Sequence, residues 1–315
     1  MDLEKVKLIF ADLDDTLSEL YKPASKKVKE YLNRLLQEGK SIVIISGQGR
    51  DNIYDRVVCG IEENLRRKIL VCGCGGAYIY GFDNDGKFEK NPIYSIYEEK
   101  LNIEQRKVWR EKISRLIKEF DLKLYKSMPK DEFTTLTNSM PNAVIFEDRE
   151  SQITFEVMND LELREKMIAR GKELMQEANL PIGVFKGGEY AIDFMVNGVS
   201  KTYAVKYLMN NTEALKKIGV NNPEKLDDEN IQVWGDKYSL INGGTDMNML
   251  YGLNKNVLAL DFRKEPIEEL DMSYNIKIWN GKKTLYEGLE EYLKLNLEKN
   301  NGEKIWIYMH RFLEQ

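Results

Sequence analysis

The chain contains 315 residues, 42% of them hydrophobic, and carries a formal net charge of −5. This length and composition predict a soluble globular protein with one large or two medium domains. The negative charge argues against nucleic acid as a partner, because binding to a phosphate backbone needs clustered positive charge. The apolar segments are too short to span a bilayer, and the first residues lack the zones of a signal peptide. We therefore expect a cytoplasmic protein that does not bind membranes.

The rarer residue types narrow the possible chemistry. The three cysteines, Cys59, Cys72 and Cys74, are an odd number in strand-like or apolar surroundings, which argues against a disulfide framework. The Cys72-Gly-Cys74 pair lacks two further ligands at metal spacing and is predicted to be a pair of buried thiols. The single histidine is His310, near the C-terminal end of the sequence. Serine-histidine triads and histidine-rich zinc sites are therefore poor candidates.

The first element in chain order is a short buried strand over residues 7–11, and it ends at two acids. Asp12 follows the strand directly and Asp14 comes next but one. Open α/β sheets bind ligands at the carboxyl ends of their strands. Two carboxylates so close together repel each other unless a metal ion or a shared proton compensates them, so one could be an ionised nucleophile and the other a proton carrier. Alone, this pattern fits an acidic surface turn or the DxD motif of a glycosyltransferase equally well.

Strand-like and helix-like segments alternate after this loop, which predicts an α/β fold with parallel βαβ units. Ser25 can cap a helix that ends at Gly39, and residues 41–46 form the next predicted strand. If the crossover is right-handed, Ser46 and Gly47 lie at the same sheet edge as Asp12. A hydroxyl and a backbone amide there could bind a phosphate oxygen, although Ser-Gly is also a common strand-ending turn.

Residues 81–189 change in character. Helical periodicity is present near 103–120 and 161–178, and strand-like segments follow at 142–147, 151–157 and after residue 183. Two helices with several antiparallel-looking strands indicate a compact α+β insert.

Charged residues return at element ends after the insert. Lys201 stands at a predicted helix start, where its ammonium and the helix amides could face an anion. The next predicted strand ends at Asp236, and Asp246 follows after a glycine-containing turn. Bringing these two carboxylates together would make an oxygen-ligand site suited to Mg²⁺. From Thr284 we expect a helix to about residue 297 and a strand-like segment, both packing on the core.

Four motifs in this order resemble the haloacid dehalogenase (HAD) superfamily of phosphohydrolases. They are DLDDT at 12–16, Ser46 at the end of the second strand, Lys201 in GVSKT, and Asp236 with Asp246 in GDKYSLINGGTD. The resemblance covers nearly the whole chain. The place and content of the insert are similar to the C2 cap of the subclass IIB, Cof-like members, which act on small phosphorylated metabolites and chiefly on sugar phosphates.

The resemblance implies a Rossmann-like, doubly wound parallel sheet as the catalytic core, formed by residues 1–80 and 190–315. Residues 81–189 would form an inserted α+β cap of the C2 type that determines substrate specificity. The candidate specificity residues of the cap are Arg149, Lys186, Glu189 and Asp193.

The resemblance also implies roles for the motif residues. Asp12 would attack phosphorus to form an aspartyl-phosphate, and Asp14 would protonate the leaving alcohol and then deprotonate water. The Asp12 carboxylate, the Asp14 carbonyl and Asp236 would hold Mg²⁺, with Asp246 as a direct or water-mediated ligand. Ser46, the Gly47 amide and Lys201 would bind the phosphoryl oxygens.

Some departures leave alternatives open. Many C2-capped phosphatases have Thr-Gly-Arg where this chain has Ser46-Gly47-Gln48. The stretch KGGEYAIDFMVNGVSKTY and the last motif look more like phosphomannomutases, which use the same aspartyl chemistry. A mutase must hold a bisphosphorylated sugar in a strongly basic cap pocket, and residues 137–151 offer only Arg149. We therefore place a Mg²⁺-dependent phosphatase, monomer or homodimer, ahead of a mutase, and both ahead of a non-catalytic regulator or a DxD glycosyltransferase.

Overall fold

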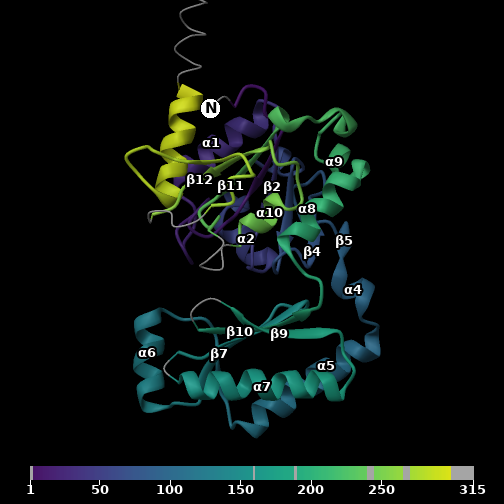
Figure 1. Cartoon of the computed structure of the whole chain (residues 1–315), viewed down its shortest axis with the longest axis vertical. Coiled ribbons are helices and arrows are strands. Elements are labelled where there is room, and N and C mark those ends of the chain that lie inside the picture. Colours follow the sequence, from purple (N-terminus) through teal and green to yellow (C-terminus); the bar gives the residue numbers. More distant parts are fainter. Residues whose placement is uncertain (1–2, 159, 188–189, 240–244, 265–269, 299–315) are drawn as a thin grey trace, which may run out of the picture. The chain divides into compact units, whose positions relative to one another are not determined.

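The computed structural model describes residues 3–158, 160–187, 190–239, 245–264 and 270–298. The chain folds into two compact units (Figure 1). The first consists of Met1–Tyr94 with Ser200–Gln315, and the second of Ser95–Val199. The predicted boundaries near 80 and 190 lie earlier in the chain than this division. Among the described residues, no helix combines the length and apolar character that a membrane-spanning segment needs.

A mainly parallel sheet forms the centre of the first unit. In the described part of the chain its strand order is β13-β12-β11-β1-β2-β3-β4-β5. The strands are β1 Leu8–Ala11, β2 Ser41–Ile45, β3 Ile69–Gly73, β4 Tyr78–Tyr80, β5 Tyr94–Ser95, β11 Ile231–Gly235, β12 Leu258–Asp261 and β13 Ile276–Ile278. All neighbouring pairs from β13 to β3 are parallel, and β4 runs antiparallel to β3. The central strands are buried along their whole length and mostly apolar, as expected for a parallel sheet covered on both faces.

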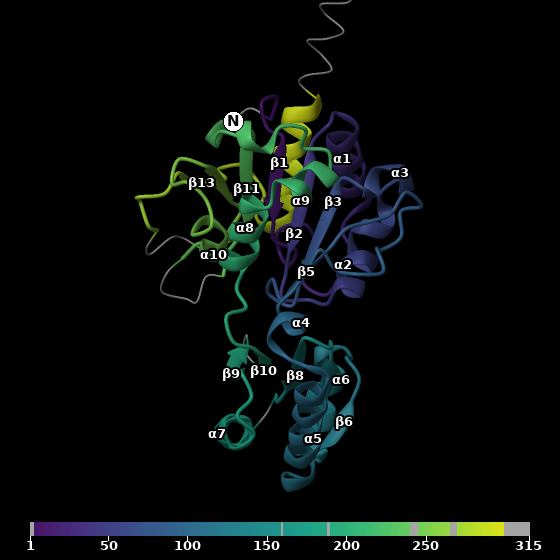
Figure 2. The ribbon, with the colours of Figure 1, turned by 90° about the vertical axis from the view of Figure 1, so that its right-hand side faces the viewer.

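Helices cover both faces of this sheet. They are α1 Lys26–Gln37, α2 Arg50–Arg56, α3 Glu63–Arg66, α8 Lys201–Asn210, α9 Thr212–Lys217 and α10 Met247–Leu250, with short 3-10 turns at Val58–Gly60, Pro223–Lys225 and Asp228–Asn230. Figure 2 shows α1 and α2 on one side of the sheet and α8 on the other. The predicted Rossmann-like, doubly wound core with an inserted α+β unit is therefore confirmed.

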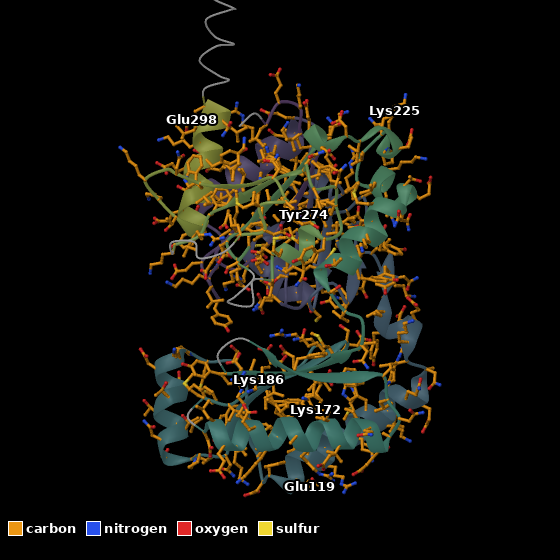
Figure 3. All side chains as sticks on the ribbon, in the orientation of Figure 1. Glu119, Lys172, Lys186, Lys225, Tyr274 and Glu298 are labelled. Carbon is orange, nitrogen blue, oxygen red and sulfur yellow. The ribbon has the colours of Figure 1, made fainter. Side chains whose placement is uncertain are left out.

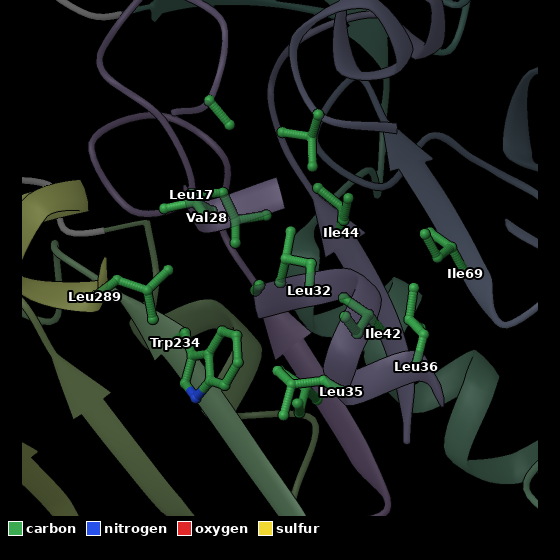
Figure 4. Packing of buried hydrophobic residues seen from close by; sticks show 14 of the residues in the cluster. Leu17, Val28, Leu32, Leu35, Leu36, Ile42, Ile44, Ile69, Trp234 and Leu289 are labelled. Atoms are coloured by element: carbon green, nitrogen blue, oxygen red, sulfur yellow. The ribbon is translucent and has the colours of Figure 1, made fainter. Parts of the chain in front are cut away.

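The apolar face that the helical period predicts for α1 packs against the sheet. Val28, Leu32, Leu35 and Leu36 share one face of α1 and pack against Ile42, Ile44 and Trp234 of the sheet (Figure 4). The side chain of Ser25 caps α1 by accepting a hydrogen bond from the Val28 amide, and Gly39 ends the helix region with a φ of 92°. Residues 285–298 are helical and place Leu289 in the same core, as predicted. The strand-like segment after residue 303 lies outside the described residues.

The second unit is an α+β structure around a mixed sheet. Its strand order in the described chain is β6-β7-β8-β10-β9, in which β6 and β7 are parallel and the other pairs antiparallel. The strands are β6 Lys123–Tyr125, β7 Ala143–Asp148, β8 Gln152–Glu156, β9 Ile182–Gly187 and β10 Ala191–Val196, and the helices are α4 Ile96–Lys100, α5 Ile103–Glu119, α6 Lys130–Ser139 and α7 Leu161–Glu177. Both long helices were predicted, and the three predicted strand-like segments correspond to β7, to β8, and to β9 together with β10. The helix α6 was not predicted, because its threonines have low helix propensity.

Candidate active site

Two neighbouring parallel strands each end at an aspartate. Asp12 follows β1 and Asp236 follows β11, and the register pairs Ala11 with Trp234. The Asp12 amide donates a 2.9 Å hydrogen bond to the Trp234 carbonyl, which continues the ladder into the acidic loop. Asp12, Asp236 and Asp246 are buried, and one carboxylate oxygen of each lies within 4.8 Å of the others. The strand-end rule accounts for the meeting of Asp12 and Asp236, whereas Asp246 directly precedes α10.

Asp246 holds the loop together through both of its oxygens. Its Oδ2 accepts hydrogen bonds from the amides of Asp236, at 3.0 Å, and Lys237, at 2.9 Å. Its Oδ1 accepts a 2.7 Å hydrogen bond from Lys201. This packing needs the glycine at position 235, because a Cβ there would lie 2.5 Å from Oδ2. Asp246 therefore acts first as an organiser of the site.

Lys201 bridges two of the acids. It is the first residue of α8, whose cap Ser200 accepts a hydrogen bond from the Tyr203 amide. Its ammonium lies 2.6 Å from Asp12 Oδ1 and 2.7 Å from Asp246 Oδ1, and the residue is only 7% exposed. Burial alone would lower the pKa of Lys201, but the two carboxylates outweigh it and raise the pKa. The ammonium therefore stays charged across the physiological pH range.

The acids carry more negative charge than one lysine can balance. Burial raises the pKa of Asp12 to about 7, with Asp246 adding to the rise and Lys201 opposing it. Burial, Asp246 and Asp12 together raise the pKa of Asp236 to about 8. Both shifts have the same physical cause, which is the cost of placing several carboxylates in one water-poor site.

The donor set fits a hard divalent cation. Asp12 Oδ2 and Asp236 Oδ2 accept no hydrogen bond from any of the residues that the structure describes, whereas Asp236 Oδ1 accepts one from Thr16 at 3.2 Å. Mg²⁺ prefers such carboxylate oxygens. Because both oxygens of Asp246 are already engaged, Asp12 and Asp236 are the better placed ligands of the three.

The Asp14 carboxylate is held apart from this cluster. Arg56 at the end of α2 donates to its Oδ1 at 2.5 Å, and Gln48 donates to its Oδ2 at 3.4 Å. In the sequence Gln48 stands out only as a departure from Thr-Gly-Arg, and no motif points to Arg56. Arg50, which follows soon after Gln48, instead lies over the ring of Tyr80 at 4.5 Å.

Ser46 and Gly47 lie at the predicted edge. They follow β2, which is the other neighbour of β1. Ile44 of β2 is in register with Ala11 of β1. Ser46 is buried, and its hydroxyl accepts a 3.1 Å hydrogen bond from the Gln48 amide. A Cβ added at Gly47 would meet no atom within 4 Å. There is consequently room for a ligand beside this backbone.

The candidate specificity residues of the second unit divide between the two faces of its sheet. Asp193 of β10 accepts hydrogen bonds from Thr154, at 2.7 Å, and Gln152, at 2.8 Å. Arg149 pairs with Glu147 after β7. Lys186 of β9 lies on the α7 side of the sheet and forms an ion pair with Glu165 (Figure 3). Glu189 lies outside the described residues.

Comparisons with known proteins agree with this arrangement. A family model described as haloacid dehalogenase-like hydrolase matches residues 9–217. No match was found among curated proteins. A solved haloacid dehalogenase-like hydrolase from Bacteroides thetaiotaomicron is 17% identical with a TM-score of 0.56, over 92% of this chain and 98% of that one.

Two further solved structures have the same fold. The C-terminal domain of trehalose-6-phosphate phosphatase from C. albicans is 16% identical with a TM-score of 0.57, over 93% of this chain and 92% of that one. Trehalose-6-phosphate phosphatase from Aspergillus fumigatus is 12% identical with a TM-score of 0.50, over the same shares of the two chains. Identities this low show likeness of fold alone. The family model spans more than half of the sequence, so the chain belongs to the haloacid dehalogenase-like hydrolase family.

Proposed function

We propose that this chain is a Mg²⁺-dependent phosphatase that hydrolyses a small phosphorylated metabolite, a sugar phosphate, through an aspartyl-phosphate. The observation that carries the proposal is the buried arrangement of Asp12, Asp236 and Asp246 around Lys201, with Asp14 in the same loop. The fold likeness to enzymes named trehalose-6-phosphate phosphatase supports the sugar phosphate.

Asp12 is the proposed nucleophile. A carboxylate oxygen forms a bond to phosphorus while the bond from phosphorus to the alcohol oxygen breaks, which leaves an acyl phosphate on Asp12. Lys201 orients the carboxylate through the 2.6 Å hydrogen bond to Oδ1 and supplies positive charge beside the phosphoryl group. Ser46 and the Gly47 amide would bind phosphoryl oxygens at the same strand edge.

Asp14 is the proposed acid and base. It would give a proton to the departing alcohol oxygen and then take one from the water that attacks the acyl phosphate. The second step releases inorganic phosphate and restores the Asp12 carboxylate. Because Asp14 has its own hydrogen-bond partners, it can work without disturbing the Asp12 cluster.

The cation would be held by Asp12 and Asp236, with the carbonyl of Asp14 as a third proposed ligand and Asp246 supporting the loop behind them. Mg²⁺ bound there would neutralise the carboxylates and the phosphate so that one anion can approach another.

The second unit favours a phosphatase over a phosphomannomutase-like enzyme. On the sheet face opposite α7, the strands β7, β8 and β10 carry Glu147, Glu156 and Asp193. Arg149 is already paired with Glu147, and burial together with Glu147 raises the pKa of Glu156. Such an acidic face suits sugar hydroxyls better than a second phosphate group. We propose that Asp193 and Arg149 contribute to specificity there.

A substrate panel tests this proposal. Phosphate release is measured with hexose phosphates, hexose bisphosphates and an aryl phosphate, each with Mg²⁺ and with chelator. The proposal predicts Mg²⁺-dependent release that is fastest with monophosphorylated sugars. Transfer of phosphate between sugar positions, without net release, would instead identify a mutase.

We also propose that the enzyme is cytoplasmic and a monomer or homodimer. The three free thiols at Cys59, Cys72 and Cys74 support a reducing compartment. Sedimentation of the purified protein would give its oligomeric state.

A further inference from the structure

The side chain of Arg56 donates four hydrogen bonds to acceptors in one loop. The residue is only 4% exposed and lies at the end of α2. Its Nη1 donates to Asp14 Oδ1 at 2.5 Å, and its Nη2 donates to the Ser18 hydroxyl at 2.7 Å and the Glu19 carbonyl at 2.8 Å. Its Nε donates to the Lys22 carbonyl at 2.9 Å. The acceptors span residues 14–22, which directly follow the proposed nucleophile.

Leu17 of this loop is buried in the core, but the end of the loop has little packing of its own. Tyr21 has a φ of 60°, which an ordinary side chain adopts only under constraint. Leu20 and Tyr21 are 43% and 62% exposed, so little apolar packing holds them. The Ala24 amide donates to the backbone carbonyl of Arg56, which ties the end of the loop to the same residue. Arg56 is therefore the common anchor of the loop and of the Asp14 side chain.

A guanidinium group suits this task. It is planar, permanently charged and presents its donors in a fixed fork, so it defines where each acceptor lies. With Gln48 on the other oxygen, both carboxylate oxygens of Asp14 are directed by named donors. A lysine would supply the charge but not the fork.

We propose that Arg56 is a positioning residue for the proposed phosphatase reaction: it holds the Asp14 carboxylate, and the loop 18–22, in the geometry in which Asp14 serves the leaving group. The inference rests on the proposed function. It goes beyond that function because it assigns the proton-transfer geometry to a residue on α2 that is not among the proposed phosphate or cation ligands.

The inference predicts a dependence on the leaving group. An alkyl phosphate must lose a poor leaving group that needs a proton, whereas p-nitrophenolate departs without one. The ratio kcat/KM reports the steps up to departure of the alcohol, so it isolates this proton transfer from the later attack of water. Arg56→Gln should lower kcat/KM for the best alkyl phosphate by at least about 10-fold more than for p-nitrophenyl phosphate. The loss should appear in kcat, with KM nearly unchanged.

A second buried arginine is the matched control. Arg66 is 8% exposed and donates to the carbonyls of Ile61, Gly86 and Cys59 and to the Tyr54 hydroxyl. It contacts none of the candidate site residues through these bonds. Arg66→Gln should therefore change kcat/KM by the same factor for the alkyl phosphate and for p-nitrophenyl phosphate.

Arg56→Lys and a double-mutant cycle guard against a merely structural effect. Arg56→Lys should recover part of the alkyl phosphate activity, and it provides a folded variant if Arg56→Gln does not fold. In an Asp14→Asn background, Arg56→Lys should have almost no further effect on kcat/KM, because its target is gone. The inference would be overturned if an Arg56 variant lowered kcat/KM by the same factor for both substrates. It would also be overturned if the effects of Arg56→Lys and Asp14→Asn on kcat/KM were additive. A wild type that hydrolyses no ester with Mg²⁺ would instead remove the proposed function, and the inference with it.

Discussion

The Lys201 ammonium lies 2.6 Å from the Asp12 carboxylate, although the two residues are 189 positions apart in the chain. This contact joins the first helix turn after the second unit to the loop after the first strand. It places one fixed positive charge beside the proposed nucleophile, whose Oδ2 stays available, together with Asp236, to a cation.

Replacing Lys201 should therefore affect the fold as well as the reaction. Lys201→Met leaves the buried carboxylates of Asp12 and Asp246 without their cation, which should cost about 3–5 kcal/mol of unfolding free energy in chelator at pH 8. Urea denaturation measures this loss. Lys206→Met, on an exposed position of the same helix, should change stability by no more than about 0.5 kcal/mol. Equal stability of the two variants would contradict the bridging role.

Replacement by asparagine should affect the stability of the protein differently at Asp246 and at Asp236. An amide at position 246 must set its NH₂ group against either Lys201 or the two backbone amides, so Asp246→Asn should destabilise the protein by about 1–3 kcal/mol. Asp236→Asn removes a repelling carboxylate and should leave the metal-free protein as stable as the wild type or more so. Thermal unfolding in chelator compares them. A greater loss of stability in Asp236→Asn than in Asp246→Asn would show that Asp246 is not the organiser of the site.

The raised pKa values of Asp12 and Asp236, about 7 and about 8, predict that Mg²⁺ competes with protons. Raised carboxyl pKa values stabilise the metal-free fold below the unfolded pKa of about 4, and this contribution is lost as pH rises through 7 to 8. Stabilisation by Mg²⁺ should therefore increase between pH 5 and pH 8.

Melting temperatures with Mg²⁺ and with chelator, taken across that range, test the competition. In Asp236→Asn the increase should be much smaller, because one of the competing carboxyl groups is missing. A Mg²⁺ effect that is constant with pH in the wild type would argue against binding at this cluster.

Replacement of glycine by alanine should have different effects on stability at positions 235 and 47. In Gly235→Ala the new methyl group meets Asp246 Oδ2 at 2.5 Å, so unfolding free energy should fall by about 1–3 kcal/mol. In Gly47→Ala it meets no atom within 4 Å, so stability should stay within about 0.5 kcal/mol while KM for phosphate esters rises. Denaturation and steady-state kinetics on both variants separate the effects. An unchanged KM in Gly47→Ala would show that phosphate does not approach this backbone.

The sequence allowed the strand-end acids to be predicted because local patterns carry that information. Apolar runs before Asp12, Ser46 and Asp236 indicate parallel strands, and parallel strands bring their carboxyl ends to one edge. The helical period likewise predicted α1, α5 and α7. Such elements form because one of their faces is buried, and the spacing of apolar residues in the sequence indicates that face directly.

Contacts between distant segments could not be predicted in the same way. Nothing in the sequence around Arg56 indicates that its side chain reaches Asp14, because that contact depends on how α2 packs beside the loop. The engagement of both Asp246 oxygens depends on a turn whose conformation no periodicity describes. The placement of Lys186 on the α7 side follows from the register of β9 with β10, which a glycine-containing stretch does not reveal.

The most direct test of the central claim compares wild type with Asp12→Asn for phosphate release from a sugar phosphate, with Mg²⁺ and with chelator. Asp15→Asn is the matched control, because it removes a neighbouring charge at a φ of 59° that asparagine tolerates. We expect Mg²⁺-dependent release by wild type and Asp15→Asn, and a loss of at least about 10³-fold in folded Asp12→Asn. Release by Asp12→Asn near the wild-type rate would show that Asp12 is not the nucleophile.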